Sequence, residues 1–126
     1  MSGFTFDSNI LIDALAGLPQ AKDEIARSAG LGGRVWISRL VWIEVMSKGS
    51  APDLRRTEHF LSGFAVEEVD TEIGARAAAL RRERPRLKSA DALILATAQL
   101  RNRVLVTRNI EDFPAAMPGI RVPYTL

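Results

Sequence analysis

Three acidic residues stand where a carboxylate is more useful for chemistry than for solubility. Asp7 follows a short apolar run, Glu44 lies inside the apolar segment LVWIEVM, and Asp91 directly precedes the apolar segment ALILA. A buried carboxylate is costly unless it is paired, hydrogen-bonded or bound to a cation. Each acid alone has an ordinary explanation, such as a helix cap, the helix dipole or an ion pair. Their joint placement predicts that they converge on one site.

A convergent cluster of carboxylates predicts metal-assisted chemistry. Such acids repel one another and hold protons at neutral pH unless a cation is present. Oxygen donors without a histidine or cysteine nearby suit Mg²⁺ or Mn²⁺. Such an ion polarises a phosphodiester and lowers the pKa of a bound water. The predicted activity is therefore phosphoryl transfer of the nuclease type.

The composition is that of an ordinary globular protein. The chain has 126 residues, of which 47% are hydrophobic and 25% charged, so we expect one domain over residues 1–126. It has no cysteine, which excludes a disulfide framework, thiol catalysis and cysteine-ligated zinc. No apolar run is long enough for a transmembrane helix, and the first residues lack the basic region of a signal peptide. A cytoplasmic location without a membrane partner is expected.

Short β-like runs alternate with helical stretches, which predicts an α/β fold with a central parallel sheet of about four to five strands flanked by helices. The expected strands are 4–6, 35–37, 64–69, 104–106 and 120–122. The expected helices are one after Asp7 capped by Ser8 or Asn9, then 19–29, one capped by Ser38 that stops at Gly49, one opened by Pro52 and Asp53, one capped by Thr71 that ends before Pro85, and one capped by Ser89. Functional groups gather beyond the carboxyl ends of such strands, where Asp7 falls.

Positive charge is concentrated in one segment. Between Arg76 and Lys88 there are six basic residues and one acid, on a chain whose net charge is +2. Such a stripe could hold a polyanion near the acidic residues, although a solvated helix face is the ordinary alternative. No aromatic residues interleave with it, so base stacking is not indicated. The candidate phosphate contacts are Arg81, Arg82, Arg84, Arg86 and Lys88.

The order of these motifs resembles the PIN-domain nucleases, and most closely the VapC-like toxins of bacterial and archaeal toxin–antitoxin systems. The similar segments are FTFDSNILIDAL, ISRLVWIEV and SADALILATAQLRNRVLVTRNIEDF. The resemblance implies a PIN-like domain and an endoribonuclease that depends on Mg²⁺, or alternatively Mn²⁺. It also implies an RNA substrate, a small antitoxin protein that holds the enzyme inactive, and a homodimer. By position it implies that Asp7 and Asp91 are metal ligands and that Glu44 is the helix glutamate of the site.

The resemblance leaves the fourth acid of the site open. The family often has an acid where this chain has Asn109, and Asp112 follows three residues later. Either Asp112 completes the site, or Asn109 contributes its amide oxygen. Thr107 and Asn9 are expected to orient the acids. Asp13 is expected on the helix surface, although the resemblance leaves open a supporting role for it.

Other functions fit the sequence less well. A catalytically silent PIN-like module that binds nucleic acid or has a regulatory role would use the basic stripe, but the intact set of three acids argues against it. A phosphatase resembling the haloacid dehalogenases needs a second aspartate two residues after the first, where Asn9 stands. A P-loop enzyme is excluded because the motif G-x-x-x-x-G-K-[ST] is absent.

Overall fold

The computed structural model describes residues 3–48 and 50–126, and over these residues it contains a parallel sheet of five strands. The strands are β1 (Phe4–Phe6), β2 (Val35–Ser38), β3 (Ala65–Glu67), β4 (Val104–Val106) and β5 (Ile120–Arg121). Their order is β3-β2-β1-β4-β5, and every neighbouring pair is parallel. The predicted α/β fold is confirmed.

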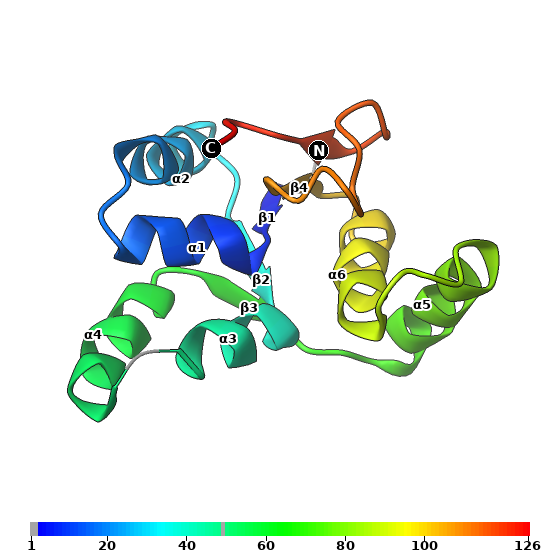
Figure 1. Ribbon diagram of the computed structural model, residues 1–126, viewed down its shortest axis with the longest axis horizontal. Coiled ribbons are helices and arrows are strands. Elements are labelled where there is room, and N and C mark those ends of the chain that lie inside the picture. The colour runs from blue at the N-terminus through cyan, green and yellow to red at the C-terminus, as the bar shows by residue number, and fades with distance from the viewer. Residues whose placement is uncertain (1–2, 49) are drawn as a thin grey trace.

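Six helices flank the sheet in the described part of the chain. They are α1 (Ser8–Leu15), α2 (Pro19–Gly30), α3 (Arg39–Met46), α4 (Ala51–Leu61), α5 (Thr71–Glu83) and α6 (Ser89–Leu100). Figure 1 shows α1, α2 and α4 on one side of the sheet and α5 and α6 on the other. Helix α3 contacts α1, α4 and α6. In the range that the structure covers, no helix combines the length and apolar character that crossing a membrane requires.

The core lies where the sheet meets the inner faces of the helices. Its fully buried side chains include Phe6, Ile10, Leu11, Ile37, Leu105 and Phe113. The ring of Phe6 also meets that of Phe64 edge to face, with 5.8 Å between the ring centroids. Full burial of one such side chain is worth about 1.5–3 kcal/mol. Packing on this scale holds the strand ends in place, and with them the residues that follow the strands.

Helix starts were predicted to within one residue but often with the wrong cap. The carboxylate of Asp70, rather than Thr71, caps α5. The N-cap position of α6 is Lys88, which makes no side-chain cap, so the prediction of Ser89 was wrong. The predicted cap of α3 by Ser38 is confirmed. Propensity places a helix start approximately, whereas the capping bond depends on local backbone geometry.

Several element ends also differ from the prediction. Strand β3 covers residues 65–67 rather than 64–69, and β5 stops one residue before 122. Helix α2 continues one residue beyond 29, to Gly30. Helix α3 ends at Met46, short of 48, and the predicted stop at Gly49 lies outside the described residues.

Candidate active site

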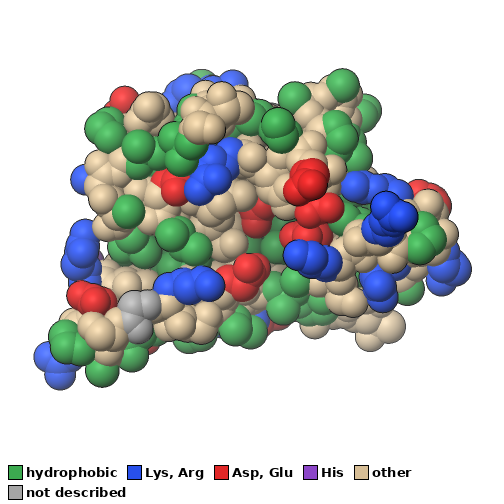
Figure 2. Space-filling model, in the orientation of Figure 1, with side chains coloured by type: hydrophobic (Ala, Val, Ile, Leu, Met, Phe, Trp, Pro, Cys, Tyr) green, Lys and Arg blue, Asp and Glu red, His purple; other side chains and the backbone are tan. Residues whose placement is uncertain are grey.

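The carboxyl ends of parallel strands meet at one edge of the sheet, and this edge positions the candidate residues. Asp7 follows β1 and Thr107 follows β4, and the backbone N–H of Asp7 donates to the carbonyl of Val106 at 2.9 Å. Glu44 lies on α3, and Asp91 lies in the first turn of α6. Figure 2 shows acidic side chains gathered across the middle of this face. Folding therefore brings the predicted acids to one region.

Asp7 is the most enclosed of these acids, with 4% of its surface exposed. Its carboxylate accepts hydrogen bonds from the backbone N–H of Ser8 and from the hydroxyl of Thr107, both at 2.8 Å. Asp7 therefore caps α1 itself, and the prediction that Ser8 or Asn9 caps this helix was wrong. Burial raises the pKa of Asp7 even though these bonds lower it. A buried carboxylate held this way favours a cation nearby.

The other acids are electrostatically coupled to Asp7. Burial, together with the charges of Asp7 and Asp112, raises the pKa of Asp91 to about 6. Burial and the charge of Asp7 also raise the pKa of Glu44. Glu44 is only half-buried, so its apolar sequence surroundings overstated its enclosure. Its carboxylate accepts a bond of 3.3 Å from the hydroxyl of Ser8. Asp7, Glu44, Asp91 and Asp112 together are called the acidic site below.

The geometry around Asn109 distinguishes the two candidates for the fourth acid. The side-chain amide of Asn109 donates to the carboxylate of Asp112 at 3.0 Å, and its amide oxygen accepts from the backbone N–H of Asp112 at 3.2 Å. That oxygen is thus already engaged within the loop. The charge of Asp112, by contrast, raises the pKa of Asp7 and of Asp91. This arrangement favours Asp112 as the fourth acid, with Asn109 holding it.

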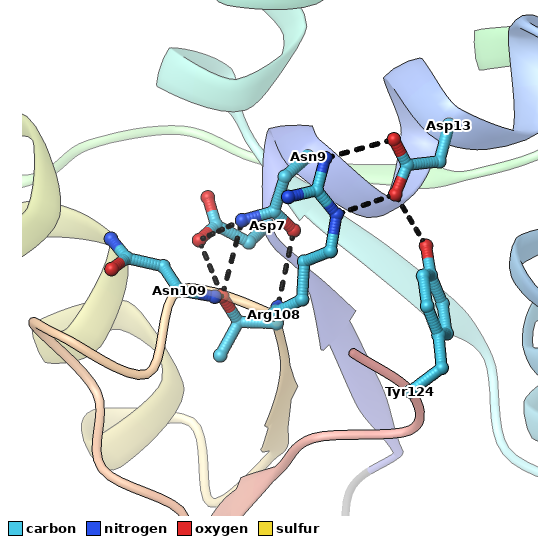
Figure 3. Close-up of polar contacts among 7 residues, drawn as sticks. Asp7, Asn9, Asp13, Arg108, Asn109 and Tyr124 are labelled. Carbon is cyan, nitrogen blue, oxygen red and sulfur yellow. Dashed lines mark hydrogen bonds and ion pairs between the residues drawn. The ribbon is translucent and has the colours of Figure 1, made fainter. Parts of the chain in front are cut away.

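Thr107 and Asn9 connect the end of β4 to α1 around Asp7. Figure 3 shows Asn9 beside Asp7. The fully buried hydroxyl of Thr107 accepts from the backbone N–H of Asn109 at 3.0 Å while it donates to Asp7. The amide of Asn9 donates to Asp7 at 3.4 Å, and its oxygen accepts from the backbone N–H of Arg108 at 3.3 Å. These bonds hold the carboxylate of Asp7 in one orientation.

The prediction that Asp13 lies on the helix surface was wrong, because only 9% of the residue is exposed. The guanidinium of Arg108 donates to both of its carboxylate oxygens, at 2.7 and 3.0 Å, and the hydroxyl of Tyr124 donates to one of them at 2.7 Å. The bonds from Arg108 lower the pKa of Asp13. These three residues, called the Asp13 clamp, are labelled in Figure 3. The one sequence signal for it was the four-residue spacing from Asn9, which places both residues on one helix face.

The acidic site has the donor chemistry of a divalent-cation site without a closed set of ligands. Among residues 3–48 and 50–126, no three acidic, histidine or cysteine side chains form a group that could hold a metal ion. The four acids are instead coupled through their charges. Carboxylate oxygens suit Mg²⁺ or Mn²⁺, and a cation beside them would offset the burial and repulsion that raise the pKa values of Asp7, Glu44 and Asp91. Asp7 and Asp91 are the candidate ligands.

The basic segment divides into residues that hold loops and residues that face solvent. The guanidinium of Arg81 donates to the carbonyl of Leu87 at 2.9 Å, and that of Arg84 donates to the carbonyl of Asp112 at 2.6 Å. The remaining candidate contacts, Arg82, Arg86 and Lys88, are exposed. The structure thus places the segment from Arg84 to Lys88 beside one member of the acidic site.

Comparison with known proteins identifies the family. The model of the PIN domain matches residues 4–116, and the chain belongs to this family. Among curated relatives, ribonuclease VapC19 of Mycobacterium tuberculosis is 32% identical over 122 residues, which cover 94% of this chain and 97% of the relative. Ribonuclease VapC10 of the same organism is 31% identical over 127 residues, which cover 91% of this chain and 95% of the relative. The family indicated by the motifs is confirmed.

Solved structures agree with this assignment. A toxin–antitoxin complex from Klebsiella pneumoniae contains a chain that is 40% identical, with a TM-score of 0.87 and coverage of 98% of this chain and 99% of that one. DNA-bound VapBC from Salmonella typhimurium contains a chain that is 27% identical, with a TM-score of 0.78 and coverage of 96% of both chains. The fold of this chain is therefore that of proteins found in toxin–antitoxin complexes.

Proposed function

We propose that this protein is a metal-dependent endoribonuclease and the toxin of a toxin–antitoxin pair, acting as one PIN-like unit over residues 1–126. The observation that carries the proposal is the acidic site at the carboxyl edge of the sheet, where the charges of neighbouring acids help to raise the pKa values of Asp7, Glu44 and Asp91. The PIN-domain match and the ribonuclease relatives support the same activity. RNA is the proposed substrate.

In this proposal Asp7 and Asp91 hold the metal ion, and Glu44 and Asp112 complete the negative surface around it. Mg²⁺, or alternatively Mn²⁺, would neutralise charge on the scissile phosphate and lower the pKa of the attacking water. Thr107 and Asn9 keep the carboxylate of Asp7 oriented through their hydrogen bonds. One carboxylate orients the water or accepts its proton while the phosphodiester is cleaved.

We further propose that a small antitoxin protein binds this chain and inhibits it. The support is the 40% identical chain in the Klebsiella pneumoniae toxin–antitoxin complex, which matches nearly the whole length of both chains. Co-expression with the cognate antitoxin should yield a complex that copurifies and does not cleave RNA. The homodimer stays a prediction, which sedimentation of the purified chain checks.

The decisive experiment is cleavage of total cellular RNA by the purified protein with Mg²⁺, with Mn²⁺ and with EDTA. We expect discrete fragments that need the metal and that are absent with Asp7→Asn. Asp23→Asn, which removes the same charge from an exposed position on α2, is the matched control and should cleave normally. If a folded protein free of antitoxin cuts no RNA with either metal, the nuclease proposal fails and the silent binding module replaces it.

A further inference from the structure

A cavity of about 730 Å³ lies between the loop that joins α5 to α6 and the loop that follows β4. Arg84, Arg86 and Lys88 line it from the first loop, and Glu111 and Asp112 line it from the second. Because Asp112 also belongs to the acidic site, the cavity and that site share a wall. Figure 2 shows Lys and Arg side chains over the α5 side of the molecule, directly beside the acidic group.

The three cations of this cavity have different roles. Arg84 has a structural role, because its guanidinium donates a hydrogen bond of 2.6 Å to the carbonyl of Asp112 and so connects the two loops. Arg86 and Lys88 are exposed, and neither side chain makes an ion pair or hydrogen bond with any other residue that the structure describes. The cavity therefore offers two positive charges without a partner in the described residues, on a loop that Arg84 connects to the backbone of Asp112.

Arg86 and Lys88 differ in this respect from the arginines that the fold uses in ion pairs. The arginines that form ion pairs with acids are Arg27, Arg39, Arg101, Arg103, Arg108 and Arg121. An arginine presents a planar fork of donors and a lysine presents a compact charge, and both bind phosphate. Arg86 and Lys88 belong to one of the two loops that line the cavity, and Glu111 and Asp112 belong to the other.

We infer that this cavity binds a backbone phosphate of single-stranded RNA next to the bond that is cut. The inference rests on the proposed function, in which the acidic site handles the scissile phosphate, and it assigns the neighbouring phosphate to Arg86 and Lys88. An unpaired strand is flexible enough to turn one phosphate into a cavity while another reaches the acids. The cavity then favours substrates that extend beyond the scissile bond, and it contributes to binding more than to the chemical step.

The test measures RNA binding with Asp7→Asn protein, which keeps the probe uncut. A fluorescein-labelled single-stranded oligouridylate is titrated with Mg²⁺ at several salt concentrations, and anisotropy gives Kd. Adding Arg86→Gln and Lys88→Gln should raise Kd about tenfold and reduce the slope of log Kd against log salt by about 0.7, because one phosphate contact contributes about 0.7 for a single strand. Arg55→Gln with Lys22→Gln removes one arginine and one lysine from exposed positions on α4 and α2. This control should change Kd less than about twofold.

Two further outcomes separate this inference from the nuclease proposal. In protein with Asp7 restored, Arg86→Gln with Lys88→Gln should raise KM for RNA and leave kcat unchanged. If the wild type cleaves RNA but this variant and its control bind and cleave alike, the cavity inference is overturned and the nuclease stands. If the wild type does not cleave while the salt slope still depends on Arg86 and Lys88, the nuclease proposal fails and the cavity remains an RNA-binding site.

Discussion

Asp7 and Glu24 are equally buried, with 4% of each exposed, yet their pKa values shift in opposite directions. Glu24 on α2 accepts two hydrogen bonds from Arg121, at 2.7 and 2.9 Å, and two from Arg27, both at 3.1 Å. Burial alone would raise the pKa of Glu24, but these bonds and charges outweigh it and lower the pKa. Asp7 accepts hydrogen bonds from uncharged donors, and its pKa is raised.

The difference shows how this protein treats a buried negative charge. At α2 the charge is structural, and two arginines compensate it. At the carboxyl edge of the sheet, hydrogen bonds stabilise the charge of Asp7, but three further acids add negative charge to the same site. Such a site destabilises the protein when no cation is bound. A cation that binds the folded state there stabilises the protein. Uncompensated charge, rather than burial, therefore marks the functional region.

The largest expected effect comes from removing one charge of the acidic site. Asp91→Asn should reduce RNA cleavage at least about a hundredfold, because it removes one of the two carboxylates proposed to hold the metal ion, whose charge stabilisation is worth several kcal/mol. In EDTA its Tm should equal or exceed that of the wild type, because the amide relieves repulsion with Asp7 and Asp112. Single-turnover cleavage and thermal melting measure the two effects. Wild-type cleavage by Asp91→Asn would remove Asp91 from the site.

The reverse result is expected at Glu24. Glu24→Gln should lower the free energy of unfolding by about 2 kcal/mol, because it leaves Arg121 and Arg27 without their acid. This is below the cost of about 3–5 kcal/mol for breaking a fully buried pair, since both arginine side chains are 39% exposed. Urea unfolding measures the loss. RNA cleavage below the Tm should stay normal, and a variant as stable as the wild type would refute the compensation described here.

The two regions should also respond oppositely to pH when no metal is present. The folded-state pKa of Asp91 is raised from 3.8 to about 6, so its contribution to stability is complete below about pH 4 and is lost as pH rises through about 6. The pKa of Glu24 is lowered, so its contribution is present above its unfolded value of 4.5 and is lost as pH falls.

This pH prediction is measured by urea unfolding in EDTA across that range. The free energy of unfolding of the wild type, relative to that of Asp91→Asn, should decline as pH rises. Relative to that of Glu24→Gln, it should decline as pH falls. Mg²⁺ should restore stability mainly at the higher pH values, where the acids are ionised. Differences that run in the same direction for both variants would contradict the comparison.

The smallest expected effect lies at the edge of the Asp13 clamp. Tyr124→Phe removes one hydrogen bond to Asp13 while both bonds from Arg108 remain. The free energy of unfolding should fall by about 1 kcal/mol, and kcat/KM should fall only a few-fold, by about 1 kcal/mol or less. Chemical denaturation and steady-state cleavage measure the two losses. An unchanged stability would mean that the hydroxyl does not strengthen the clamp.

Much of the fold and the candidate site could be predicted because the signals are local. Apolar runs separated by turn residues indicated the strands, and the position of Asp7 after the first strand indicated the functional edge. Motifs around Glu44 and Asp91 indicated the other acids. The errors at the caps of α1 and α5 concern which of several neighbouring polar residues satisfies a helix end. That choice depends on backbone angles that the neighbouring residue types do not specify.

The sequence by itself determined which elements form, because hydrophobic periodicity and turn chemistry act over a few residues. Only the tertiary structure decided which charges are compensated. Arg108 meets Asp13 across 95 positions, and Arg121 meets Glu24 across 97. Such pairs depend on where folding places two distant side chains. From the sequence alone, several arginines are equally good candidates to pair with each acid. The same packing places Asp7 among other acids. The compensated charge of Glu24 and the uncompensated charge of Asp7 could therefore be identified only in the folded chain.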